Sequence, residues 1–157
     1  MNIRKATLKD LPLLAKQYIE YQKEEDKLAS TEVGRMRSDK KSVFQDLKKF
    51  ITKPNKILLV AVDENKIIGF LAGSFTKNQT RRIKNTGFLD EIYIIPKMRG
   101  KGLSSELKDE FIEWVKKRKN GAGAIVLYVV PRNKAALKAY KKWGFKASYI
   151  NLTKKIY

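Results

Sequence analysis

The sequence contains no cysteine and no histidine. Without cysteine the chain can form no disulfide, no thiolate nucleophile and no thiol-linked covalent intermediate, and without histidine it has no imidazole base. Zinc sites built from these two residue types are excluded as well, and we expect no metal. Any proton transfer must therefore be carried out by Asp, Glu, Tyr, Lys or water.

Long apolar runs are also missing. The longest, residues 57–62 and 67–72, are far too short to cross a bilayer, and residues 1–5 lack the apolar stretch of a signal peptide. We therefore expect a cytoplasmic protein with no membrane partner. The 157 residues are 43% hydrophobic and contain no linker rich in Pro, Gly or Ser, which predicts one domain over residues 1–157.

Acidic residues are scarce. There are 16 Asp and Glu against 35 Lys and Arg, a formal charge of +19. Such a surface attracts nucleotides, nucleic acids or acidic proteins, although a general compositional bias toward lysine explains scattered lysines equally well. Two basic strings, residues 81–84 and 116–119, leave open a non-enzymatic module that binds nucleic acid. Against that alternative, no run of interleaved aromatic and basic residues marks a platform for single strands.

Hydrophobic periodicity predicts an alternation of strands and helices. We expect strands at residues 3–6, 57–62, 67–75, 87–95 and 124–130, a last hairpin or two short strands within 145–157, and helices after Asp10, after Ser38 or Asp39, from Leu103 to Trp114 and from Asn133 to Trp143. This order predicts an α/β (α+β) fold with a mixed central sheet of six to seven strands flanked by about four helices.

A glycine loop separates the strand at residues 87–95 from the following helix. Gly100 and Gly102 let the backbone approach a ligand closely, and the amides of the helix start form a cradle for an anion such as a pyrophosphate. The loop is neither a P-loop nor a Rossmann fingerprint, because Ser105 stands where the latter needs its third glycine. A plain helix-capping loop is the alternative.

Residues 92–104, IYIIPKMRGKGLS, resemble the acetyl-CoA signature of the GNAT superfamily. Arg99 and Gly102 match its core, whereas Ser104 stands where Gly or Ala is usual. The resemblance implies that the loop backbone holds the pyrophosphate and that the strand edge pairs with the pantetheine arm. The residues it assigns to the cofactor here are Ile92, Tyr93, Ile94, Arg99, Gly100, Lys101, Gly102, Leu103, Ser104 and Ser105.

A second motif follows in the order that this family requires. Asn133, Ala136, Tyr140, Gly144 and Phe145 match the pattern Asn-x-x-Ala-x-x-x-Tyr-x-x-x-Gly-Phe. The resemblance implies an acetyl-CoA-dependent N-acetyltransferase in which Asn133 contacts the cofactor arm and Tyr140 protonates the leaving CoA thiolate. From the residues alone, Asn133 is also an ordinary helix N-cap and Tyr140 a packing residue. A degenerate relative that binds CoA as a sensor is a further alternative.

The resemblance does not supply the general base, because Tyr128 stands where some family members carry a glutamate. We place the base on the strand before the glycine loop. Strict alternation would put Asp90 on the same face as Ile92 and Ile94, the face assigned to the thioester, with Glu91 on the opposite face as the reserve candidate. A solvated or salt-bridged Asp90 is the alternative.

The acceptor is expected to be a cationic amine. Acidic residues cluster in the segment between the first two expected helices, and we assign substrate binding to Glu24, Glu25 and Asp26, with Glu20 and Glu32 nearby. Charge complementarity then favours a protein N-terminus or lysine, a polyamine, or another small amine. A solvated helix end with pairs to neighbouring lysines explains the same pattern. The family resemblance also allows a homodimer.

Overall fold

A computed structural model of the chain describes residues 1–29, 39–77, 83–118 and 120–150, with residues 152, 154 and 156. The chain divides into two compact units. Unit 1 comprises Met1–Ile19 and Ser38–Leu127, and unit 2 comprises Glu20–Arg37 and Tyr128–Tyr157. None of the described helices is both long and apolar enough to cross a membrane.

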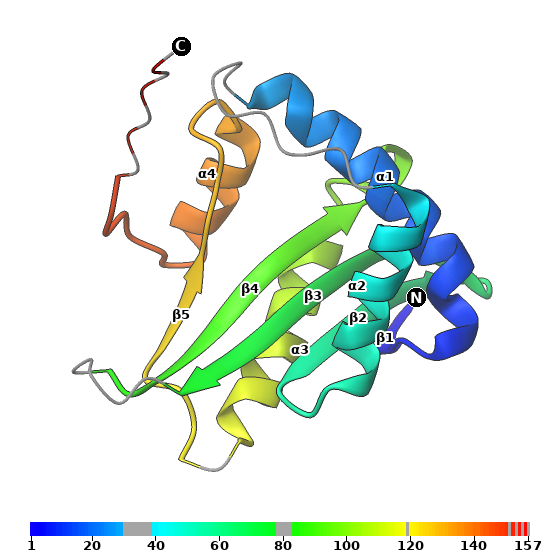
Figure 1. Cartoon of the computed structure of the whole chain (residues 1–157), viewed down its shortest axis with the longest axis horizontal. Helices are drawn as coiled ribbons and strands as arrows, with labels where there is room; N and C mark the ends of the chain where they lie inside the picture. The colour runs from blue at the N-terminus through cyan, green and yellow to red at the C-terminus, as the bar shows by residue number, and fades with distance from the viewer. Residues whose placement is uncertain are drawn as a thin grey trace. The chain divides into compact units, whose positions relative to one another are not determined.

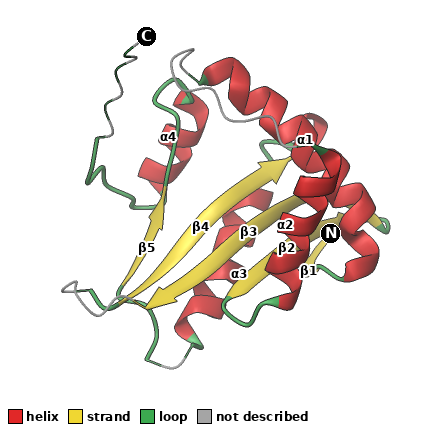
Figure 2. Cartoon of the chain, viewed as in Figure 1, coloured by secondary structure: helices red, strands yellow, loops and turns green. Residues whose placement is uncertain are grey.

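Unit 1 contains a five-stranded sheet in the order β1-β2-β3-β4-β5 (Figures 1 and 2). Its strands are β1 Asn2–Lys5, β2 Lys56–Asp63, β3 Lys66–Lys77, β4 Asn85–Ile94 and β5 Ala124–Leu127. Neighbours are antiparallel except β4 and β5, which are parallel, so the sheet is mixed as predicted.

The described residues form a sheet of five strands, fewer than the six to seven predicted. The strand expected at residues 124–130 ends at Leu127, and the described residues 145–150 form no strand. Tyr149 and Ile150 are each 86% exposed, so neither side chain packs on a core as one face of a strand would.

The helices begin and end where local chemistry predicts. They are η1 Leu8–Asp10, α1 Leu11–Leu28, α2 Lys40–Thr52, η3 Pro96–Met98, α3 Leu103–Lys116 and α4 Lys134–Lys142. Asp39 caps α2 by accepting a hydrogen bond from the Ser42 amide at 2.9 Å, whereas Ser38, the alternative cap, lies outside the described residues. Asn133 caps α4 in the same way, accepting from the Ala136 amide at 3.1 Å.

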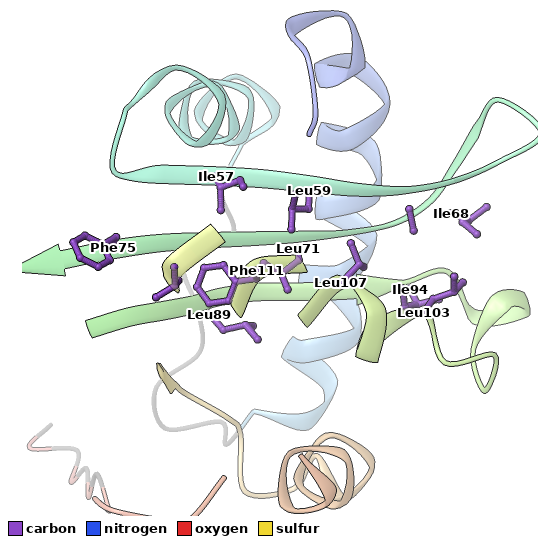
Figure 3. Close-up of a cluster of buried hydrophobic side chains, with 12 residues drawn as sticks. Ile57, Leu59, Ile68, Leu71, Phe75, Leu89, Ile94, Leu103, Leu107 and Phe111 are labelled. Carbon is purple, nitrogen blue, oxygen red and sulfur yellow. The ribbon is translucent and has the colours of Figure 1, made fainter. Parts of the chain in front are cut away.

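One hydrophobic cluster of unit 1 lies between the sheet and α3. Figure 3 shows Phe111 and Leu107 of α3 packed against Leu71 and Leu89 of the central strands, all nearly inaccessible to solvent. Gly73 permits this contact, because a Cβ there would lie 2.3 Å from the Phe111 ring. The sheet thereby fixes α3, and with α3 the glycine loop at its start.

The opposite face of the sheet carries a row of aromatic rings. The Phe70 ring lies 6.0 Å from that of Tyr18 on α1 and 5.8 Å from that of Tyr93 on β4, measured between centroids. The first part of α1 is thus packed against the two strands that lead into the candidate site.

Candidate active site

The glycine loop leaves β4 with its backbone in unusual conformations. Gly100 has φ +80° and Gly102 has φ +83°, the left-handed region that side chains with a Cβ avoid. A Cβ at either position would meet nothing within 4 Å, so the space beside both residues is open. The two glycines are therefore required by the turn and leave room for a ligand next to the backbone.

The start of α3 presents unsatisfied amides. Gly102 is the N-cap and has no side chain to cap the helix, and its carbonyl accepts from the Ser105 and Glu106 amides at 2.9 and 3.2 Å. No carbonyl of the described residues accepts from the amides of Leu103 and Ser104. These amides and the positive end of the helix dipole are suited to hold an anion, and the anion site stays a prediction.

Arg99 is fixed at the base of the loop. Its Nε donates to the Ile94 carbonyl at 2.9 Å, and its guanidinium carbon lies 5.6 Å from the centre of the Tyr93 ring. The side chain therefore ties the loop to the end of β4 and keeps a positive charge there.

Half of β4 has an open edge. β5 pairs with β4 only from Thr86 to Leu89, and beyond Leu89 none of the described strands pairs with β4 on that side. The backbone from Asp90 to Ile94 therefore offers donors and acceptors next to the glycine loop. An extended ligand with amide groups can pair with such an edge.

A β-bulge corrects the predicted orientation of the two candidate bases. Ala72 of β3 is opposite Glu91, but the next residue, Gly73, is opposite Leu89, so Asp90 is an extra residue in β4. The bulge interrupts the alternation on which the sequence prediction depended. Asp90 therefore does not share a face with Ile92 and Ile94, which pack on the core beside α3, and the prediction that Glu91 points away from Asp90 was wrong.

The Asp90 and Glu91 carboxylates both lie on the face of the sheet opposite α3. The Tyr18 hydroxyl of α1 donates to Glu91 Oε1 at 3.0 Å, and the Ser74 side chain hydrogen-bonds Asp90. Partial burial raises the pKa of Asp90, while the Ser74 hydrogen bond and the nearby Lys56 charge lower it, with a net upward shift. A carboxyl with a raised pKa is better suited to accept a proton near neutral pH.

Three residues of this arrangement were not identified from the sequence. Tyr18 falls in the helix expected after Asp10 and Ser74 in the strand expected at residues 67–75, whereas Lys56 lies one residue before the strand expected at residues 57–62. No local pattern could have revealed them, because each depends on the bulge and on which helix covers the face.

The second motif lies in unit 2. The Tyr140 ring is half-buried, with centroids 5.6 Å from Trp143 and 6.0 Å from Phe145. Gly144, with φ +85°, ends α4, and the Phe145 amide donates to the Tyr140 carbonyl at 3.0 Å. The motif therefore fixes the conformation of the helix end that carries Tyr140.

The acids assigned to the acceptor lie on the second half of α1 and not, as expected, between the first two helices, because α1 continues to Leu28. Glu24, Glu25 and Asp26 are all half-buried, and Asp26 Oδ1 is buried without a hydrogen-bond partner among the described residues. Glu20, by contrast, forms an exposed ion pair with Lys23 at 2.9 Å. Glu32 lies outside the described residues.

Comparison with known proteins agrees with this geometry. The model of the acetyltransferase (GNAT) family matches residues 18–145. An uncharacterized N-acetyltransferase of Methanocaldococcus jannaschii is 32% identical over 80 residues, which are 51% of this chain and 34% of that protein, so the match spans about a third of the relative's length.

Solved structures share the fold over the whole chain. A mutant form of a Bacillus halodurans protein has a TM-score of 0.86 at 20% identity, covering 100% of both chains. A predicted acetyltransferase from Clostridium acetobutylicum with acetyl-CoA has a TM-score of 0.74 at 24% identity, covering 97% of this chain and 95% of that one. With a glycine loop at a helix start, an open strand edge and a family match over most of its length, the chain belongs to the GNAT family of acetyltransferases.

Proposed function

We propose that the protein moves an acetyl group from acetyl-CoA to a primary amine by direct transfer in a ternary complex. The observation that carries this proposal is the juxtaposition of the open β4 edge with the uncapped start of α3. We further propose that units 1 and 2 act as one transferase domain, because the family match at residues 18–145 includes parts of both.

The residues of unit 1 fit acetyl-CoA as a co-substrate. The Gly100 to Ser104 backbone has the open space and the amides to hold a pyrophosphate, with positive charge from Arg99 and Lys101. The edge at Ile92, Tyr93 and Ile94 would pair with the pantetheine amides, as it would with an added strand. Acetyl-CoA supplies an activated acetyl group, and the protein supplies position and proton transfer.

The acceptor must be deprotonated before it can attack. An alkyl amine has a pKa of about 10 and is protonated at neutral pH. Asp90, with its pKa raised by partial burial, is our first candidate for the base, and Glu91, held by Tyr18, is the second. Because the bulge brings both carboxylates to one face, the acceptor ammonium would be bound and deprotonated on that face.

The leaving thiolate needs a proton, and we assign that role to Tyr140. Its ring is braced by Trp143 and Phe145, which would hold the hydroxyl in a defined direction. Asn133 Oδ1 already accepts the hydrogen bond that caps α4, so a contact with the cofactor arm would use the side-chain amide nitrogen. Without cysteine, no acetyl-thiol intermediate can form on the protein.

The amine class follows from the half-buried acids on α1. Asp26 Oδ1 is buried without a partner among the described residues, which is costly for a carboxylate oxygen, and a cationic acceptor would relieve that cost. We therefore propose a cationic amine: a protein N-terminus or lysine, a polyamine, or a related small amine.

The test is a screen of amines and peptides with acetyl-CoA, following the release of free thiol. We expect release with at least one cationic amine, and a higher KM for it when Glu24, Glu25 and Asp26 are replaced by Gln, with the affinity for acetyl-CoA unchanged. The alternative function, a CoA sensor without chemistry, predicts tight binding of acetyl-CoA and no amine-dependent thiol release. That result across the whole screen would contradict the proposed function.

A further inference from the structure

The fold gathers basic residues that are scattered along the sequence. The ends of five elements meet at one end of unit 1: α2, β3 and α3 end there, and β2 and β4 begin there (Figure 1). Lys77 at the end of β3 is opposite Asn85 at the start of β4, and Arg118 after α3 donates to the carbonyl of Pro54 before β2. We call this surface the basic end and define it by its six exposed lysines: Lys49, Lys53, Lys77, Lys84, Lys116 and Lys117.

The charge of the basic end is largely uncompensated. Along the two helices, the acidic residues that lie closest in sequence to these lysines, Asp46 and Glu113, each pair within their own helix, with Lys49 at 2.6 Å and Lys116 at 2.8 Å. The other four lysines form no ion pair with a described carboxylate. At low salt a bound polyanion relieves the mutual repulsion of these lysines. Binding also releases the counterions that are condensed on the polyanion.

We propose that the basic end binds the phosphate backbone of duplex nucleic acid without sequence preference. Lysine ammonium groups act as point charges toward phosphates, whereas base edges are recognised mainly by bidentate side chains such as arginine. The charges also come from separate elements, which suits contacts spread along a duplex.

The aromatic rings of the basic end argue against single strands. Lys56 Nζ lies 4.1 Å from the centre of the Phe50 ring, and the Arg118 guanidinium lies 4.6 Å from that of Trp114. These rings are covered by cations and offer no open platform for stacking bases. A membrane surface is also disfavoured, because Ile83, 45% exposed, is the one large exposed apolar side chain among the described residues of this end.

The proposal is independent of the transferase function. The basic end lies where β4 begins, whereas Gly100 and Gly102 follow the point where β4 ends. A duplex bound at the basic end would therefore leave the glycine loop accessible. Each activity can fail without the other.

The test measures fluorescence anisotropy of a labelled short duplex DNA of arbitrary sequence, at salt concentrations from about 50 to 200 mM. We expect log K to fall linearly with log salt. The double variant Lys53→Gln/Lys117→Gln should bind on the order of tenfold more weakly and have a slope shallower by about two.

The matched control, Lys16→Gln/Lys66→Gln, removes the same charge elsewhere. Lys66 lies at the opposite end of the β2–β3 pair from Lys56, and Lys16 is exposed on α1. We expect this control to keep the affinity and the slope. Equal loss in both variants, no binding of duplex, or binding only to vesicles containing anionic lipid would each overturn the proposal.

Discussion

Units 1 and 2 differ sharply in burial. Every buried hydrophobic side chain of the described residues lies in unit 1, whereas α4 in unit 2 has none, and Tyr128 and Tyr149 are 82% and 86% exposed. The glycine loop and the β4 edge are therefore supported by a packed core, while Tyr140 and the acids of α1 belong to a unit with little buried apolar surface. The comparison indicates that unit 1 contributes most of the free energy of unfolding. Substitutions in unit 2 should lower that free energy only modestly.

The largest expected effect is on the free energy of unfolding and comes from a substitution in the core of unit 1. Phe111→Ala should lower the free energy of unfolding by about 3–5 kcal/mol, because the ring is fully buried against Gly73. The matched change in unit 2, Leu137→Ala on α4, removes a side chain that is 36% exposed and should cost less than about 1 kcal/mol. Urea denaturation of both variants checks this, and equal losses would show that unit 2 is as well packed as unit 1.

Tyr140→Phe removes one hydroxyl and leaves the ring contacts with Trp143 and Phe145 in place. We expect kcat to fall on the order of 100-fold, the usual effect of losing a general acid, with the affinity for acetyl-CoA unchanged. Steady-state kinetics and a binding titration measure the two quantities. A variant with full kcat would mean that another group or water protonates the thiolate.

Gly102→Val sharpens the comparison at the loop. A β-branched side chain at φ +83° adds strain of about 1–3 kcal/mol and places atoms beside the amides of α3. The added atoms occupy the space beside the amides that would hold the phosphates, so part of the strain falls on the complex alone. The Kd for acetyl-CoA should therefore rise at least about tenfold. Gly144→Val, at φ +85° in unit 2, introduces similar strain and should leave that Kd unchanged.

The smallest expected effect concerns pH. If Asp90 is the base, kcat/KM should rise with pH through a limb that lies above the ordinary Asp value of about 3.9, because burial raises its pKa. Lys56→Met removes a charge that lowers this pKa and should move the limb slightly to higher pH, whereas Asp90→Asn should abolish it. A limb unaffected by both changes would exclude Asp90 as the base.

The same shift has a consequence for stability. Between the unfolded pKa and the raised folded pKa of Asp90, the folded protein binds more protons than the unfolded chain, so stability falls as pH rises through that window. Asp90→Asn should remove this fall.

Local chemistry explains what could be predicted from the sequence. The β2–β3 hairpin follows from short apolar runs around a polar turn, and the caps at Asp39 and Asn133 and the end at Gly144 follow from side-chain and backbone preferences of single residues. The glycine loop was predicted for the same reason, since Gly100 and Gly102 alone suit its positive φ angles.

The features that were missed depend on partners distant in sequence. The bulge at Asp90 is a property of the β3–β4 register, and the end of β5 at Leu127 is set by pairing, which alternation alone does not reveal. The basic end likewise arises only when the ends of five elements meet.

Amide hydrogen exchange with and without acetyl-CoA tests the central claim most directly, that unit 1 holds the co-substrate between the α3 start and the β4 edge. The account predicts slower exchange on addition of acetyl-CoA at Gly100 to Ser104 and at the edge amides within Ile92–Ile94. Unchanged exchange at these amides in the presence of saturating acetyl-CoA would contradict it.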